Sequence, residues 1–174
     1  MHYKIIILNS KGGAGKDTFF KFCKEILGDC TYHISTVDCV KDLAMDLGWN
    51  GEKTLRDRRG LSNLKDLMTM WGDIPYQDVK SEISDIIYEW MNGGEDFGVI
   101  FVDCREPDEI YRFNQELGAQ SLLIVRDSLP TNYGNHADDD VFNYKYDYVI
   151  DNNGSLEDLR EAAKTFINEI RPKE

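Results

Sequence analysis

Several classes of protein are excluded by what this sequence lacks. Only 4 prolines occur in 174 residues and there is no internal repeat, which argues against a disordered, collagen-like or repeat-built chain. The 4 cysteines form no CxxC pair and the 3 histidines add no metal-type spacing, so we expect reduced, mostly buried thiols. The early apolar run at residues 5–8 is too short for a signal sequence or a membrane span. These absences favour a cytoplasmic protein without a membrane partner.

Positive charge is also scarce. The chain has 20 Lys and Arg residues against 32 Asp and Glu residues, a formal net charge of -12. A surface this acidic repels duplex DNA, so we expect no nucleic-acid partner held by general electrostatic attraction. Any phosphate group that the protein binds must be held by a local site that opposes the overall field.

What the sequence does contain is an alternation of short apolar segments with amphipathic ones. Hydrophobic residues make up 41% of the chain, and its length suits one domain with a sizeable core. We predict five strands, at residues 3–8, 31–36, 99–103, 121–125 and 146–150. We predict helices at residues 16–27, 40–47, 61–71, 76–91, 107–117 and 155–170. This alternation indicates a three-layer α/β fold, with residues 1–174 as a single domain of about five parallel strands and helices on both faces of the sheet.

A glycine-rich segment follows the first predicted strand and precedes the first predicted helix. Glycine lets backbone N–H groups converge on a phosphate, because it reaches positive φ and has no side chain in the way. The helix N-terminus adds partial positive charge, and Lys16 would contact the β- and γ-phosphates. The segment therefore predicts the P-loop NTPase fold with ATP as cofactor. The predicted nucleotide contacts are Lys11, Gly12, Gly13, Ala14, Gly15, Lys16, Asp17 and Thr18.

Two positions depart from the usual G-x-x-x-x-G-K-[ST] pattern. Ser10 stands where the first glycine usually is, and Asp17 replaces the hydroxyl residue that normally contacts Mg²⁺, with Thr18 one place further on. Asp103 ends an apolar run, as a Walker B carboxylate does, and from the end of a neighbouring strand it can order Mg²⁺ through water. We predict a magnesium site at Asp103 and Asp17, with Asp17 binding the ion directly, through water, or serving only as a helix cap.

Arginines carry special weight in so acidic a chain. Phosphoryl transfer spreads negative charge over the moving group, and nearby cations stabilise that charge. Arg105 and Arg126 lie at the ends of the third and fourth predicted strands, where ligands bind in open α/β folds. We expect both to be catalytic, together with Lys16 and Asp103. Three further arginines precede the long helices and are candidates for binding the acceptor: Arg56, Arg58 and Arg59.

The tetrad Gly15-Lys16-Asp17-Thr18 resembles the phage group of deoxynucleoside monophosphate kinases, and its Gly-Lys-Asp is similar to that of animal-type phosphomevalonate kinases. The likeness to the phage enzymes continues in Asp103-Cys104-Arg105, in residues 118–126 and in residues 151–156, whereas the middle of the chain matches poorly. The resemblance implies a kinase that uses ATP and Mg²⁺ to phosphorylate a nucleoside or deoxynucleoside monophosphate. By position, it also implies that Asn152 and Gly154 lie near the adenine.

The same resemblance implies separate roles for two segments of the chain. Residues 49–76 are expected to be an acceptor-binding insertion, and residues 127–145 a lid loop. This loop contains no arginine, unlike the lids of such enzymes, and its one basic residue is Lys145 at the end. The expected partner is a small-molecule monophosphate, and the expected assembly is a monomer or a homodimer.

Two other interpretations remain open from the sequence. Lys11-Gly12-Gly13-Ala14-Gly15-Lys16 also resembles the deviant Walker A motif of partition and septum-site ATPases, in which the early lysine acts across a dimer. Those proteins have Thr or Ser after the second lysine, where this chain has Asp17. The third interpretation is a nucleotide-binding regulatory module without catalysis, which the aspartate and the arginine-poor lid would suit.

Overall fold

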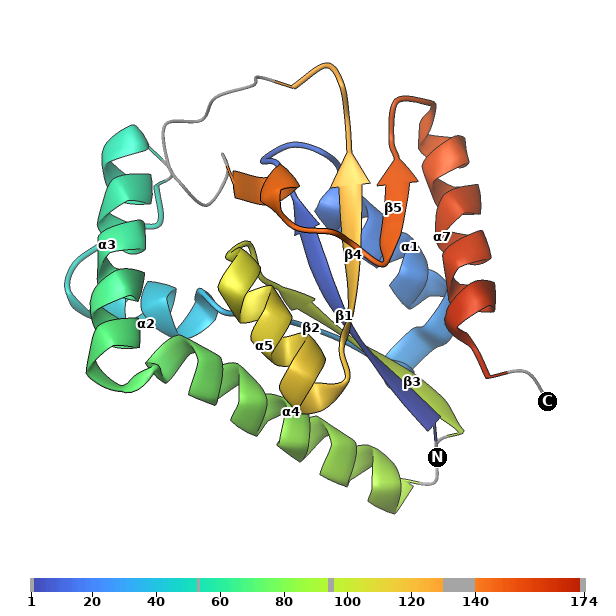
Figure 1. Ribbon diagram of the computed structural model, residues 1–174, viewed down its shortest axis with the longest axis horizontal. Coiled ribbons are helices and arrows are strands. Elements are labelled where there is room, and N and C mark those ends of the chain that lie inside the picture. The colour runs from blue at the N-terminus through green and yellow to red at the C-terminus, as the bar shows by residue number, and fades with distance from the viewer. Residues whose placement is uncertain (1, 53, 94–95, 130–139, 173–174) are drawn as a thin grey trace.

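The fold centres on one parallel sheet. The computed structural model describes residues 2–52, 54–93, 96–129 and 140–172. The strands lie in the order β2-β3-β1-β4-β5, and every neighbouring pair is parallel (Figure 1). Their bounds are β1 His2–Ser10, β2 Thr31–Ser35, β3 Phe97–Asp103, β4 Gln120–Val125 and β5 Tyr148–Asp151. The five predicted strands are confirmed, with no end shifted by more than two residues.

Helices cover both faces of this sheet, which confirms the predicted three-layer α/β architecture (Figure 1). Their bounds are α1 Lys16–Leu27, α2 Asp38–Asp46, α3 Leu55–Gly72, α4 Ile74–Gly93, α5 Pro107–Leu117 and α7 Leu156–Ile170. Two short 3₁₀ helices are added, η1 at Gly28–Cys30 and η2 at Asp140–Asn143. Among the described residues, no helix combines the length and apolar character needed to cross a membrane.

β1 is central because its side chains are apolar on both faces. Ile6 and Leu8 enter a core under α1 and α7, while Ile5 and Ile7 enter a second core under α4 and α5. Strands buried on both faces read as continuous apolar runs, and this is the pattern of residues 5–8. The glycine-rich segment therefore starts from the central strand of the sheet, between β3 and β4.

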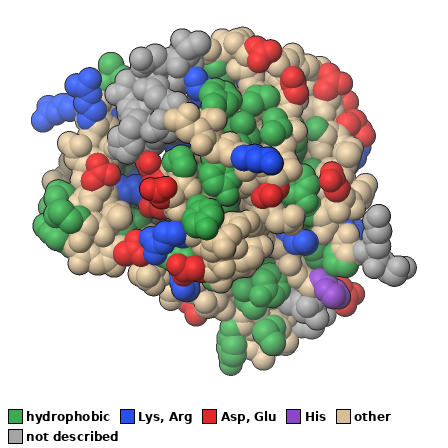
Figure 2. Space-filling model, in the orientation of Figure 1, with side chains coloured by type: hydrophobic (Ala, Val, Ile, Leu, Met, Phe, Trp, Pro, Cys, Tyr) green, Lys and Arg blue, Asp and Glu red, His purple; other side chains and the backbone are tan. Residues whose placement is uncertain are grey.

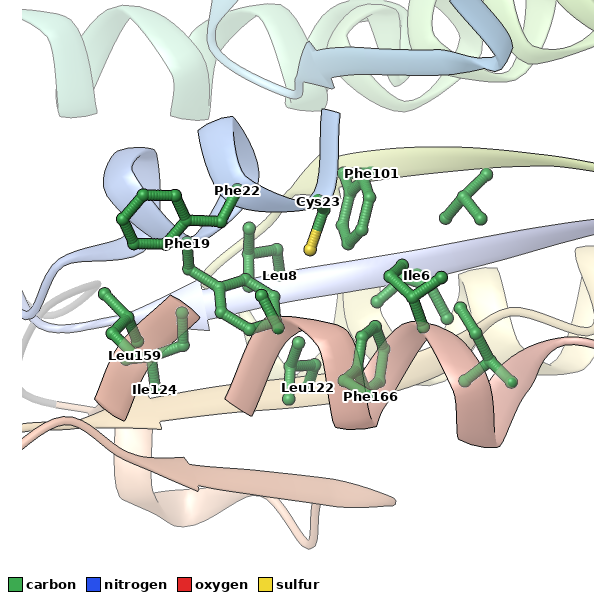
Figure 3. Packing of buried hydrophobic residues seen from close by; sticks show 14 of the residues in the cluster. Ile6, Leu8, Phe19, Phe22, Cys23, Phe101, Leu122, Ile124, Leu159 and Phe166 are labelled. Carbon is green, nitrogen blue, oxygen red and sulfur yellow. The ribbon is translucent and has the colours of Figure 1, made fainter. Parts of the chain in front are cut away.

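The core under α1 and α7 is rich in aromatic rings. Figure 3 shows Phe19 and Cys23 of α1 and Phe166 of α7 packed against side chains of β1, β3 and β4. The rings of Phe19 and Phe166 have centroids 5.8 Å apart. This packing fixes α1, and with it the loop that leads into α1, against the sheet.

α3 begins six residues earlier than the predicted helix at residues 61–71. Thr54 and Asp57 form a capping box, in which the Thr54 side chain accepts from the Asp57 N–H and the Asp57 side chain accepts from the Thr54 N–H. That local signal starts the helix inside the basic stretch, so Arg56, Arg58 and Arg59 are helical. The prediction placed them in an irregular segment and was wrong on this point.

Negative charge is spread over the surface. Figure 2 shows Asp and Glu side chains across one face of the molecule, gathered along its upper right edge. The protein therefore offers an anion little general attraction, and a phosphate site has to depend on local donors.

Candidate phosphate-binding site

The glycine-rich segment folds as a tight loop between β1 and α1. Ala14 N–H donates to the Lys11 carbonyl over 3.1 Å, and Phe19 N–H donates to the Gly15 carbonyl over 2.9 Å, which begins the helix. Gly13 and Gly15 have φ of 88° and 97°, a region that other residues rarely adopt. The backbone after β1 thus follows the sequence prediction: strand, glycine-rich turn, lysine and helix N-terminus.

Asn152 braces this loop from the end of β5. Its side-chain Nδ2 donates to the Ala14 carbonyl over 2.8 Å, and its backbone N–H donates to Val125 over 2.8 Å. A Cβ on Gly15 would lie 2.3 Å from that Nδ2 atom. Gly154 lies at the start of α7, where a Cβ would meet Asp158. The structure thus assigns Asn152 a contact with the loop backbone, in addition to the adenine contact expected from the sequence.

Lys16 is held by a carboxylate from the neighbouring strand β3. Its Nζ forms an ion pair with Asp103 Oδ2 and lies 3.6 Å from Asp17 Oδ1. The other oxygen of Asp103, Oδ1, accepts from His33 Nε2 over 2.9 Å, and the His33 ring packs on Phe20 with centroids 4.3 Å apart. The predicted pairing of the loop with the carboxylate at the end of β3 is therefore present in the fold.

Asp103 remains ionised in this setting. Burial on its own raises the pKa of Asp103, but the hydrogen bond from His33 and the positive charge of Lys16 outweigh burial and hold the pKa below its usual value. The carboxylate at the end of β3 therefore carries a full negative charge at neutral pH, as a magnesium-ordering group requires.

A cavity of about 950 Å³ opens beside the loop. Its volume is at the upper end for small-molecule sites, so it has room for more than the phosphates of a single nucleotide. The part of its wall nearest the loop includes Lys11, Gly12, Gly13, Gly15, Lys16, Asp17, Thr18 and Asp103. Residues of α2 and α3 also line it, namely Lys41, Arg58, Leu61, Ser62 and Lys65, together with Trp49 between these helices. Arg105 and Arg126 complete its cationic lining.

Some of the predicted arginines line this cavity and others do not. Arg105, Arg126 and Arg58 line it together with the loop, whereas Arg56 and Arg59 are exposed and are not among its described lining residues. An α-helix turns about 100° per residue, so Arg58 faces a different direction from its neighbours two places before and one place after it. The structure therefore brings one of the three predicted acceptor arginines to the site.

The lining residues that the sequence analysis missed include His33, Trp49 and Lys65. His33 lies beside Asp103 because β2 and β3 are adjacent and parallel, with His33 in the middle of β2 and paired with Phe101, two residues before Asp103. Trp49 lines the cavity with its indole N–H donating to the Glu52 carbonyl over 3.0 Å. Lys65 follows Arg58 by seven residues, the spacing of one helix face, but this signal depends on knowing where α3 begins.

The residues present fit a magnesium ion that is held mainly by phosphate. Within the described ranges, no group of three or more His, Cys, Asp and Glu side chains could hold a metal by itself. Mg²⁺ in nucleotide sites usually takes one or two carboxylates and completes its shell with phosphate and water oxygens. Asp103 and Asp17, on either side of the Lys16 ammonium, match that requirement.

Geometry and chemistry together define an α/β protein with a P-loop at the carboxyl edge of its sheet. No protein family model matches the chain, and no curated protein matches its sequence. Among solved structures, a cysteine-to-alanine mutant of the Mycobacterium tuberculosis APS kinase CysC is similar over 96% of both chains, with 12% identity and a TM-score of 0.41. The same enzyme in complex with AMPPNP and APS covers 96% of both chains with 15% identity and a TM-score of 0.31. Similarity this low says nothing about the activity of the present chain.

Proposed function

We propose that this protein is a cytoplasmic P-loop kinase of the phage-like group, which transfers the γ-phosphoryl group of ATP to a nucleoside or deoxynucleoside monophosphate. The supporting observation is that one cavity contains both a phosphate loop and a separate set of cations on α3. A protein that only binds or hydrolyses ATP has no need of the second set. A kinase needs it to hold an anionic acceptor beside the donor.

Lys16 is the residue that would change partner on binding. In the free protein its ammonium is paired with Asp103. The β- and γ-phosphates of ATP carry more negative charge than one carboxylate, and the loop N–H groups and the N-terminus of α1 would add to their attraction. Lys16 would therefore turn to the phosphates and leave the Asp103 carboxylate available to order Mg²⁺.

Asp103 and Asp17 are the residues that would hold Mg²⁺, through water or directly. The bound ion neutralises charge on the phosphates and helps to orient them for in-line transfer. Arg105 and Arg126 would stabilise the negative charge on the transferring group, because they follow β3 and β4 on either side of the loop strand. Arg58 would bind the acceptor.

The transfer itself needs no general base. An oxygen of the ionised acceptor phosphate attacks the γ-phosphorus, and the bond from that phosphorus to the β–γ bridging oxygen breaks, releasing ADP. Water has to be kept out while this happens, because otherwise ATP would be hydrolysed. We propose that residues 49–76 bind the acceptor and that residues 127–145 act as a lid; residues 130–139 of this loop lie outside the described part of the chain.

One contact bears on the partition-ATPase alternative. Lys11 Nζ lies 5.0 Å from the centroid of the Phe142 ring in the same chain, a cation–π arrangement. The early lysine thus has a contact within its own protomer, which favours an intrachain role over action across a dimer. We propose a monomer or a homodimer in which each subunit has its own complete site.

The proposal is tested by ATP consumption across a panel of ribonucleoside and deoxyribonucleoside monophosphates, with Mg²⁺ and with oligomeric state measured alongside. Formation of a diphosphate from one or a few acceptors, lost in Lys16→Met, is the expected result. ATP-dependent dimerisation that is lost in Lys11→Ala, with slow hydrolysis and no acceptor, would instead identify the partition-type switch. Tight ATP binding with neither outcome would identify a regulatory module.

A further inference from the structure

A buried ion pair includes one residue of the cavity wall on α3. Lys65 Nζ of α3 donates to Glu109 Oε2 of α5 over 2.6 Å, and each residue is 8% exposed. Cys104, directly after β3, has its Sγ 3.3 Å from the same oxygen and donates to it. Lys65 and Cys104 are among the residues that line the cavity, whereas Glu109 is not among its described lining residues. Glu109 therefore supports Lys65 from behind.

Lys65 belongs to one face of α3 that is turned toward the cavity. Arg58, Leu61, Ser62 and Lys65 all line it, and their spacing is that of a single helical stripe. Along this stripe α3 presents two cations with a hydroxyl group between them. Such a stripe suits a ligand that carries negative charge and oxygen acceptors, and Lys65 is its buried end.

Stability alone is a weak reason for the Lys65–Glu109 pair. Removing two charges from water is costly, and well-packed apolar side chains of similar size usually stabilise a protein as well or better. Lys65 does, however, reach the cavity. The Lys65 ammonium carries three N–H donors, and Glu109 accepts from one of them. The bond to Glu109 also fixes the Lys65 side chain in advance, so binding a ligand costs less side-chain conformational entropy.

The neighbouring Cys104 thiol adds no negative charge to this cluster. Burial, with the negative charge of Glu109 adding to it, raises the pKa of Cys104 well above its usual value. Cys104 thus stays neutral and acts as a second donor to Glu109. The carboxylate accepts from two donors, and Lys65 is the charged residue of this cluster that lines the cavity.

We propose that Lys65 binds the anionic phosphate of the acceptor and that Glu109 is a positioning residue that holds the Lys65 ammonium in place. This inference rests on the proposed kinase function and adds a specificity-determining residue to it. ATP would be held by the loop, whereas Lys65 lies on α3, so Lys65 should affect the acceptor and leave the donor unchanged.

The test is steady-state kinetics with deoxyadenosine, deoxyguanosine, deoxycytidine and thymidine monophosphates as acceptors. Lys65→Met keeps the length of the side chain and removes its charge. We expect the KM for the acceptor to rise about 10- to 100-fold, the loss typical of one charge-assisted hydrogen bond, with the KM for ATP unchanged. Lys65→Arg should recover part of the loss.

Glu109→Gln separates positioning from charge. The Gln amide keeps an oxygen that accepts from Lys65, so the KM for the acceptor should stay within about threefold of the original value. If the ion pair were purely structural, Glu109→Gln and Lys65→Met would change this KM equally. Lys80→Met is the matched control, because Lys80 and Glu116 form a 2.8 Å ion pair between α4 and α5 and neither is among the lining residues. Should Lys65→Met fail to fold, Lys65→Met with Glu109→Met removes both charges together and is read in the same way.

Failure of the inference can be told from failure of the proposed function. Transfer by the original protein with an unchanged acceptor KM in Lys65→Met overturns the role of Lys65 and leaves the kinase standing. Absence of transfer to every ribonucleoside and deoxyribonucleoside monophosphate overturns the kinase; calorimetry with the four deoxynucleoside monophosphates, in the presence of AMPPNP, then decides the role of Lys65. Binding that Lys65→Met weakens tenfold or more supports it, and binding that is absent or unchanged overturns it.

Discussion

Replacing Gly15 by alanine would put a methyl group where the side chain of Asn152 lies. The added Cβ would be 2.3 Å from Asn152 Nδ2, so Asn152 would have to move and lose its bond to the Ala14 carbonyl. A side chain at φ 97° costs about 1–2 kcal/mol in backbone strain, and the lost hydrogen bond costs about 1 kcal/mol. We therefore expect Gly15→Ala to lower the free energy of unfolding by about 2–3 kcal/mol.

A double-mutant cycle with Asn152→Ala separates these two costs. Asn152→Ala alone should cost about 1 kcal/mol, and in its background Gly15→Ala should cost only the strain of about 1–2 kcal/mol. The changes are therefore less than additive by about 1 kcal/mol, a coupling that urea unfolding can resolve. Gly28→Ala is the control, because Gly28 also has positive φ, at 66°, but a Cβ there would meet nothing within 4 Å. Equal costs of Gly15→Ala in both backgrounds would refute the contact between the loop and Asn152.

Three further results are expected. Lys16→Met should weaken ATP binding about 10- to 100-fold by calorimetry, because it removes one charge-assisted contact, and a change under threefold would contradict the assigned role. His33→Phe keeps a flat ring but deletes the donor to Asp103; kcat should fall about tenfold with the KM for ATP little changed, and equal changes in both would point to disruption of the fold. Hydrogen bonds from Arg112 hold the pKa of Asp73 below its usual value, so this pair stabilises the protein above the unfolded-state pKa of Asp73 and stops doing so as pH falls through the folded-state pKa. Arg112→Met should thus cost about 1 kcal/mol more at neutral pH than in strong acid, where only its contact with the Tyr76 ring is lost, by urea unfolding across pH; a cost independent of pH would contradict this.

The parts of the site that could be predicted are those encoded by neighbouring residues. The loop, Lys16 and the N-terminus of α1 follow one another in the chain, so the glycine pattern was enough to place them. Asp103 could be predicted because a carboxylate after an apolar run lies at the strand end where the loop also lies. The sheet and its two helical layers followed from the alternation of apolar and amphipathic segments.

The parts that could not be predicted depend on contacts between distant segments. His33 meets Asp103 only because β2 and β3 are neighbours in the sheet, and strand order is not written in either strand. Lys65 meets Glu109 because α3 packs near the start of α5. The distinction between Arg58 and the arginines beside it depends on the phase of a helix whose start was predicted too late.

The central place of β1 also constrains how this protein can be made. β1 is synthesised before its hydrogen-bonding neighbours β3 and β4, which come much later in the chain. The glycine-rich turn therefore cannot contact Asp103 or Asn152 until those later residues have been synthesised. Until β3 and β4 have been synthesised, the apolar residues 5–8 have no sheet to join. The nascent chain therefore depends on rapid formation of the sheet afterwards, or on a chaperone, to keep β1 from pairing with other chains.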